Sequence, residues 1–324
     1  MRSMRALVLL VVVAPPALAS DGVLEINQSC AVQTGCFAGD AAGFPVTING
    51  LAGHSYRLTS SLRLDDPAQY DASSTALEIQ GDRITVDLGG FQISGPCSNE
   101  CPAGSGDGVS AADFNEAIEI KNGTVVGMGR HGVSAGSSGI VQEIRAIANG
   151  EAGIRTGTST LVLASTSERN GGDGVSVGDG SVVRGCTARI NDGAGIVATF
   201  DAKISESTSL SNIGDGIRTS GGAIVESNSV ASNGGHGIVS GAGSLIRGNS
   251  ARANGTGATG DGIRASSGSA VKDNTVRVNH GFGLALTFPT SYSGNTITSN
   301  NGGTVSGGPD LGGNYCDTPA GTCP

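Results

Sequence analysis

An asparagine that returns every 21 residues is the feature of this sequence that most restricts its fold. Every spacing is 21 residues except one of 25, and the column reads Asn149, Asn170, Asn191, Asn212, Asn233, Asn254, Asn279 and Asn300. The longer step holds four extra residues, near Thr256–Thr259. Self-similarity at a fixed period of this length indicates a repeat architecture in which each unit is one supersecondary element.

Three apolar columns share the period of the asparagine. They lie eight residues before it, three residues before it and five residues after it, where the last column reads Ile154, Val175, Ile196, Ile217, Ile238, Ile263, Leu284 and Val305. Three short extended pieces per period, separated by Gly, Asn and Ser, describe one coil of a parallel β-helix. A single coil cannot bury its own apolar side chains, but stacked coils form a continuous core. We expect about eleven coils, each about 4.8 Å from the next.

A fourth column, five residues before the asparagine, changes from small residues to amides. Its last four members are Asn228, Asn249, Asn274 and Asn295. Identical amides stacked at the strand spacing can bond to the copies above and below, so we predict an internal amide ladder. Cys186 occupies the same column and is therefore predicted to be a buried thiol rather than a nucleophile.

Composition agrees with a β-rich chain and excludes other architectures. The 324 residues include 55 Gly, which is too many for a helical bundle. These glycines do not recur at every third position, as they would in collagen. Left-handed β-helices repeat by hexapeptides, or about 18 residues per coil, which does not match. Leucine-rich repeats also carry an asparagine column. Leu is rare in the apolar columns, however, and the next apolar residue follows at the fifth position rather than the second.

The repeated pattern Asn-Gly-x-x-Gly-Ile, in coils such as ASNGGHGIVSGAGSLIRGNS, resembles the repeat of the pectin-lyase-like superfamily. The resemblance covers about residues 70–307. It implies an all-β, single-stranded, right-handed parallel β-helix. Proteins of that superfamily include polysaccharide lyases, galacturonan hydrolases, uronan epimerases, adhesins and secreted proteins without known activity. The motif is therefore specific for a fold and not for a reaction.

The segments on either side of the solenoid have their own signals. Residues 1–19 combine a basic start, the apolar run Ala6–Ala14 and the cleavage-site sequence Ala17-Leu18-Ala19, which together predict a secretory signal peptide. The apolar run is shorter than the ~20 residues that cross a bilayer. Residues 20–69 and 308–324 are predicted to be N-terminal and C-terminal caps, because an open strand edge invites aggregation.

Cysteine usage and charge indicate an exported protein that does not bind nucleic acid. Six of the seven cysteines form sequence-local pairs, which we predict to be disulfides in an oxidising compartment: Cys30–Cys36, Cys97–Cys101 and Cys316–Cys323. Loss of Arg2 and Arg5 with the signal peptide leaves 17 of 19 basic residues against 28 acidic ones, a net charge of −11. Phosphate binding needs a basic face. We expect a secreted or periplasmic monomer without a membrane span.

The residue before the repeated glycine forms a turn column with titratable members. It reads Asp107, His131, Ala152, Asp173, Ala194, Asp215, His236, Asp261 and Phe282. Asp215, His236 and Asp261 fall on three consecutive coils, about 5 Å apart, and are the predicted catalytic residues of any acid/base chemistry on a polysaccharide. Arg218 and Arg264 flank them and are candidates to hold a substrate carboxylate. Asp-Gly and His-Gly are also ordinary turn sequences, which is the competing interpretation.

A second candidate site lies beside the longest predicted loop. Asp107, at the end of that loop, is expected near Arg130 and His131, and the three are predicted to bind substrate. The catalytic signatures of galacturonan hydrolases are absent, apart from the fragments His131-Gly132 and His236-Gly237.

These observations favour a secreted scaffold that presents a surface or binds a glycan or the cell envelope. The alternative is a carbohydrate-active enzyme, either a uronan lyase or a glycosidase, that acts on an extracellular polysaccharide. No cofactor or metal is expected, although the resemblance implies Ca²⁺ if the protein is a lyase.

Overall fold

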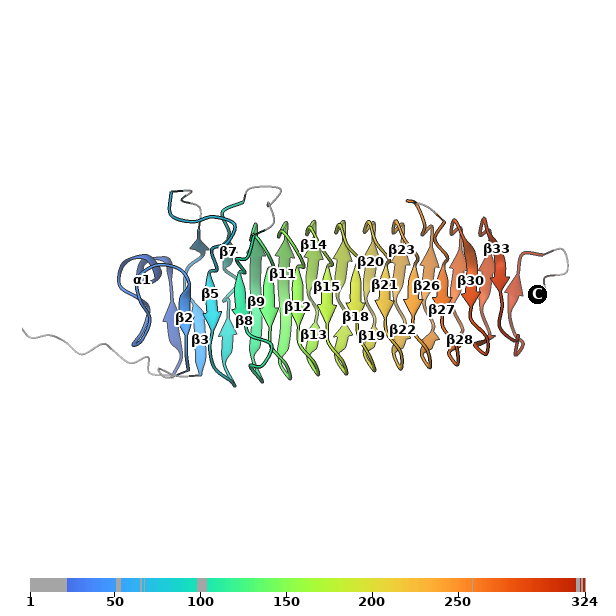
Figure 1. The fold of residues 1–324 in the computed structure, drawn as a ribbon, viewed down its shortest axis with the longest axis horizontal. Coiled ribbons are helices and arrows are strands. Elements are labelled where there is room, and N and C mark those ends of the chain that lie inside the picture. The colour runs from blue at the N-terminus through green and yellow to red at the C-terminus, as the bar shows by residue number, and fades with distance from the viewer. Residues whose placement is uncertain are drawn as a thin grey trace, which may run out of the picture.

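In the computed structural model, the chain winds into an elongated stack of turns whose two ends lie at opposite ends of the molecule (Figure 1). The structure describes residues 22–50, 54–64, 66, 68–97, 104–257, 259–318, 321 and 323. A regular turn contributes three short strands, and all pairings between the described strands are parallel, as in that of Ile196 with Ile217 one turn later. The expected parallel β-solenoid with a 21-residue repeat is confirmed.

The strands form two sheets along the stack. The 12-stranded sheet takes one strand from each turn: β2 (Val46–Ile48), β5 (Leu77–Ile79), β8 (Val109–Ala111), β10 (Val133–Ala135), β12 (Ile154–Thr156), β15 (Val175–Val177), β18 (Ile196–Ala198), β21 (Ile217–Thr219), β24 (Ile238–Ser240), β27 (Ile263–Ala265), β30 (Phe282–Leu286) and β33 (Gly303–Ser306).

The 22-stranded sheet contains the remaining strands. A regular turn contributes two short strands to it, whereas β9 and β11 are each one long strand that spans both positions. The strands are β1 (Leu24–Ile26), β3 (Ser55–Leu58), β4 (Leu62–Arg63), β6 (Thr85–Asp87), β7 (Gln92–Ser94), β9 (Glu119–Val126), β11 (Ile140–Ile147), β13 (Leu161–Leu163), β14 (Thr166–Glu168), β16 (Val182–Arg184), β17 (Thr187–Arg189), β19 (Lys203–Ser205), β20 (Thr208–Leu210), β22 (Ile224–Glu226), β23 (Ser229–Ala231), β25 (Leu245–Arg247), β26 (Ser250–Arg252), β28 (Ala270–Lys272), β29 (Thr275–Arg277), β31 (Ser291–Ser293), β32 (Thr296–Thr298) and β34 (Tyr315–Cys316).

The three apolar columns form one continuous core. Ile217, Val225 and Val230 represent the three columns within one turn, and none of them is exposed to solvent. Side chains alternate along a strand, so the residues between these positions face outward. Each turn thus buries only a few side chains, and the stacking of turns supplies the rest of the core.

Two amide ladders run through the bends. In the first, every asparagine from Asn149 to Asn279 donates from Nδ2 to Oδ1 of the next, over 2.9–3.0 Å. The second ladder was predicted for Asn228 to Asn295, and the structure extends it to Asn314 with the same spacing of 3.0 Å. The ladders satisfy backbone N–H groups in the bends, which have no partner in the sheets.

The solenoid begins earlier than the predicted boundary at residue 70. Strands β2, β3 and β4 pair with β5, β6 and β7, so the segment predicted as a cap already contains a turn. The remaining cap includes a six-residue helix, α1 (Gln28–Gln33), at the N-terminal end of the stack (Figure 1). Asn27 caps it by accepting a hydrogen bond from the Cys30 N–H at 3.0 Å. The periodicity could not reveal this helix because it precedes the repeats.

Two of the predicted disulfides are present, Cys30–Cys36 and Cys316–Cys323. The third involves Cys101, which lies outside the described residues, as do residues 1–19 of the predicted signal peptide. Cys186 is a free, buried thiol, as predicted, and burial raises its pKa to about 11. Within the described ranges, no helix is long and apolar enough to cross a membrane.

Candidate functional site

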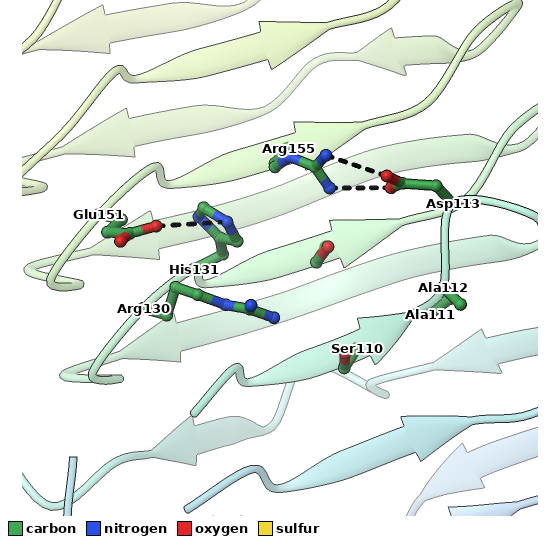
Figure 2. Close-up of a pocket in the computed structure, with 9 residues that line it drawn as sticks. Ser110, Ala111, Ala112, Asp113, Arg130, His131, Glu151 and Arg155 are labelled. Atoms are coloured by element: carbon green, nitrogen blue, oxygen red, sulfur yellow. Dashed lines mark hydrogen bonds and ion pairs between the residues drawn. The ribbon is translucent and has the colours of Figure 1, made fainter. Parts of the chain in front are cut away.

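A pocket of about 500 Å³ opens on the outer face of the 12-stranded sheet, over β8, β10 and β12 (Figure 2). The strand register creates its floor. Val109, Val133 and Ile154 point into the core, so the residues that follow them, Ser110, Ser134 and Arg155, point outward and stack in one row. Ser134 is nevertheless only 4% exposed, because its neighbours cover it.

Arg130 forms one wall of the pocket, and Asp107 holds its guanidinium in place. Its Nε donates to Oδ1 of Asp107 at 2.8 Å, and its Nη2 contacts Oδ2 of the same carboxylate. Asp107 is completely buried, and its Oδ1 also accepts the His131 N–H at 3.0 Å. The hydrogen bond to Asp107 raises the pKa of Arg130. Two of the predicted residues therefore line the pocket, while the third, Asp107, holds Arg130 in place.

Arg155 and Asp113 close the opposite side of the pocket. Two parallel hydrogen bonds of 2.8 and 3.1 Å join the guanidinium to the carboxylate (Figure 2). Such bidentate pairing fixes both groups in orientation as well as distance. The hydrogen bond from Arg155 lowers the pKa of Asp113, and Asp113 in turn raises the pKa of Arg155.

His131 presents an N–H donor to the pocket. Its Nδ1 accepts the backbone N–H of Ala152 at 3.2 Å, which places the ring proton of the neutral imidazole on Nε2. Nε2 lies 3.5 Å from Oε2 of Glu151 (Figure 2). Desolvation by burial lowers the pKa of His131 below its ordinary value of 6.5. The imidazole is therefore neutral at pH 7.

The structure brings Asp215, His236 and Asp261 together, as the turn column predicts, but their acceptor atoms are occupied. Asp215 Oδ1 accepts the His236 N–H at 2.8 Å, His236 Nδ1 accepts the Asp261 N–H at 2.9 Å, and Asp261 Oδ1 accepts the Phe282 N–H at 2.9 Å. Each side chain thus bonds to the backbone one turn later.

The two predicted carboxylate-binding arginines lie beside this column. Arg218 pairs with Asp215 at 2.8 Å, and Arg264 pairs with Asp261 at 3.2 Å. Asp173 makes the same backbone contact, accepting the Ala194 N–H at 2.7 Å, although no histidine neighbours it in the column. These contacts tie each turn of the solenoid to the next, and Asp215, His236 and Asp261 do not line the pocket.

Sequence analysis did not identify Asp113, Ser134, Glu151 or Arg155 as site residues. Arg155 and Ser134 occupy the outward row of the 12-stranded sheet, so the repeat register was the available signal for them. Asp113 comes from the segment between β8 and β9 and reaches a partner 42 residues later, which no period predicts. In the part of the chain that the structure covers, no group of three or more His, Cys, Asp or Glu side chains is placed to hold a metal ion.

Comparisons with known proteins agree with this architecture. A family model described as a right-handed β-helix region matches residues 106–254. The fold is a parallel β-helix, and the match identifies residues 106–254 as a right-handed β-helix region. A comparison with curated proteins finds no match.

Several solved structures share the fold. The A-module of Azotobacter vinelandii mannuronan C-5 epimerase AlgE6 superposes with a TM-score of 0.60 at 15% identity, covering 92% of this chain and 89% of that one. The periplasmic alginate epimerase AlgG, in a mutant form, gives 0.61 at 14% identity, covering 90% and 82%. A GH87 alpha-1,3-glucanase from Streptomyces thermodiastaticus gives 0.61 at 12% identity, covering 93% and 64%. Identities this low establish similarity of fold alone.

Proposed function

We propose that this protein is an exported, glycan-binding β-helix that holds a polysaccharide in the pocket formed by Arg130, His131 and Arg155. The observation that carries the proposal is the Ser134 hydroxyl. Ser134 lines the pocket, is 4% exposed, and has no side-chain hydrogen-bond partner among the described residues. The Ser134 oxygen is not sealed from solvent but is reached from the pocket, so a ligand there can form hydrogen bonds with it in place of water. Sugar hydroxyls can both donate to and accept from a serine hydroxyl.

Three further facts support a sugar ligand and export. The pocket offers an N–H donor on His131 and guanidinium groups held by Asp107 and Asp113. The three solved structures with the same fold are named as enzymes of mannuronan, alginate and alpha-1,3-glucan. The two disulfides fit an oxidising compartment, and one of those three proteins is titled periplasmic.

The geometry favours binding over catalysis. A general base needs a free lone pair within reach of the substrate. His131 and His236 each use Nδ1 to accept a backbone N–H, so neither can take a proton there without losing that bond. Of the two carboxylates that line this pocket, Asp113 is engaged by two hydrogen bonds from Arg155, so a lyase or glycosidase here would depend on Glu151, whose side chain is half exposed and 3.5 Å from His131. Ca²⁺ would enter only with a lyase mechanism.

The test combines binding and product formation. Wild-type protein, Arg155→Ala and the matched control Arg264→Ala are titrated with a polysaccharide panel by isothermal calorimetry. Arg264 occupies the same outward row of the 12-stranded sheet and pairs with an aspartate as Arg155 does, but it lies away from the pocket. We expect Arg155→Ala to lose binding and Arg264→Ala to keep it, with no unsaturated or reducing-end products from any variant.

Two results would contradict the proposal. Equal affinity of wild type and Arg155→Ala would place the glycan elsewhere. Products that appear with wild type and vanish in Glu151→Gln would identify a carbohydrate-active enzyme instead. Circular dichroism and thermal unfolding of each variant separate loss of the pocket from loss of the fold.

A further inference from the structure

A second pocket of about 350 Å³ adjoins the first, because Ser110 lines both. It lies over β5 and β8, and Glu78 and Phe44 are among its lining residues. Glu78 pairs with Ser110 in the register of the 12-stranded sheet, and the same outward row continues through Ser134 to Arg155. Three strand steps separate Glu78 from Arg155, or about 14 Å along the stack. The two pockets thus lie next to each other over four turns, and together they are called the groove below.

The cations of this groove are already neutralised. Arg130 is paired with the buried Asp107, and Arg155 makes two hydrogen bonds to Asp113. Each guanidinium uses two of its five N–H donors on its aspartate, and that carboxylate offsets its charge, so neither arginine adds net positive charge to the groove.

The groove also holds carboxylates in excess. Glu78 has neither a hydrogen bond nor an ion pair from its side chain in the described part of the chain, and Glu151 contacts only the neutral His131. With Asp107 and Asp113, four carboxylates face two guanidinium groups, a formal charge of −2. Like charges repel across a site that water only partly screens.

We infer that the groove selects a glycan that supplies hydrogen-bond donors and carries no carboxylate, which means a neutral or amino-sugar polymer rather than a polyuronate. The inference rests on the proposed function and specifies the ligand of the same site. Glu78 and Glu151 accept hydroxyl or ammonium donors, and the Ser110 and Ser134 hydroxyls bond to the sugar in the middle of the groove. A uronate carboxylate would instead meet the like charges of Glu78 and Glu151, while the charges of Arg130 and Arg155 are already offset by Asp107 and Asp113.

Phe44 adds an apolar surface at the N-terminal end of the groove. Its ring packs edge-on against Tyr70, with centroids 5.4 Å apart and an interplanar angle of 72°. This contact holds the phenyl ring in place, so that a sugar can pack its C–H face against it without ordering a mobile side chain. A ring at this position serves an uncharged sugar face better than a carboxylate.

The test compares oligosaccharides of equal length that differ in charge. Neutral glucan oligomers, glucosamine oligomers and oligouronates are titrated into wild type, Glu78→Gln and the control Glu206→Gln by calorimetry at low salt. Glu206 is exposed, lies in a turn of the other sheet and has no side-chain partner in the described part of the chain. We expect wild type to bind a carboxylate-free oligomer at least about tenfold more tightly than the oligouronates, since one or two unscreened like charges oppose the latter.

The variants and the salt dependence complete the test. Glu78→Gln should reduce the ratio of the affinity for the carboxylate-free oligomer to that for the oligouronates about threefold, because it removes one of the opposing charges. Glu206→Gln should leave this ratio unchanged. Loss of affinity in added salt would identify the amino sugar as the ligand, and insensitivity to salt would identify the neutral one. Oligouronates that bind as tightly as the others would overturn the inference. If Arg155→Ala abolished that uronate binding, the proposed function would still stand; if no glycan bound at all, both would fail.

Discussion

Replacement of one ladder asparagine should destabilise the whole solenoid, and Asn212 is the best position to show it. Its Oδ1 accepts the backbone N–H of Asn191 at 3.0 Å and the Asn191 side chain at 2.9 Å. Its Nδ2 donates to the Ala188 carbonyl, the Ser209 hydroxyl and Oδ1 of Asn233, over 2.9–3.1 Å. Asn212→Ala removes these five hydrogen bonds from a site that is 2% exposed.

The expected cost follows from which groups are left unpaired. The Asn191 N–H has no other acceptor, and a buried donor without a partner costs about 1–3 kcal/mol. The remaining bonds contribute about 1 kcal/mol each, but several of their partners keep a second bond, so the total should be about 3–5 kcal/mol. Asn300→Ala should cost less, because Asn300 is only partly buried and makes three such bonds: its Oδ1 accepts two from Asn279, and its Nδ2 donates one to the Val276 carbonyl.

Chemical denaturation followed by circular dichroism measures the difference. Asn301→Ala is the matched control, since Asn301 is exposed and its side chain makes no hydrogen bond to another described residue. A surface substitution of that kind changes the free energy of unfolding by about 0.5 kcal/mol or less. If Asn212→Ala unfolded at the same denaturant concentration as Asn301→Ala, the ladder would contribute nothing and the reasoning would be refuted.

Three further outcomes follow from the core, the histidines and the free thiol. Ile217→Ala opens a cavity at an unexposed site and should cost about 2–5 kcal/mol; an unchanged denaturation midpoint would contradict its packing. Burial holds the pKa values of His131 and His236 below 6.5, so the unfolded chain binds more protons in acid. Their contribution to stability is complete above pH 6.5 and is lost as pH falls toward their folded pKa values. The free energy of unfolding should therefore change less with pH across that window in His236→Ala than in wild type. Cys186, with a pKa of about 11, should react with a thiol reagent only when the protein unfolds. Rapid labelling of the native protein would contradict this prediction, because it would show that the thiol is accessible to solvent.

The repeat made the core predictable because it fixes which residues stack. Once the period is 21, Ile217 must lie on Ile196 and under Ile238, and the inward and outward rows follow from strand alternation. The same logic placed Asp215, His236 and Asp261 side by side. Spacing alone could not show that each of these side chains accepts a backbone N–H from the next turn.

The pocket was harder to predict because its walls come from parts of the chain that do not repeat. Asp113 belongs to an irregular segment and meets Arg155 only after the intervening turn is in place. Arg130 and His131 were within reach of sequence reasoning, since both neighbour a turn position occupied by Asp107. The repeat register predicts that Ser134 points outward, but that its hydroxyl opens into a pocket is a property of the folded surface, which the sequence does not reveal.

Hydrogen–deuterium exchange with bound glycan tests the central claim most directly. The protein is exchanged with and without a saturating carboxylate-free oligosaccharide, and peptides over residues 104–114 and 128–136 are compared with those over residues 213–219 and 259–265. We predict slower exchange in the first pair, where the pocket lies, and no change in the second pair, where the Asp215–His236–Asp261 column lies. Protection confined to the second pair, with the pocket peptides unchanged, would contradict it.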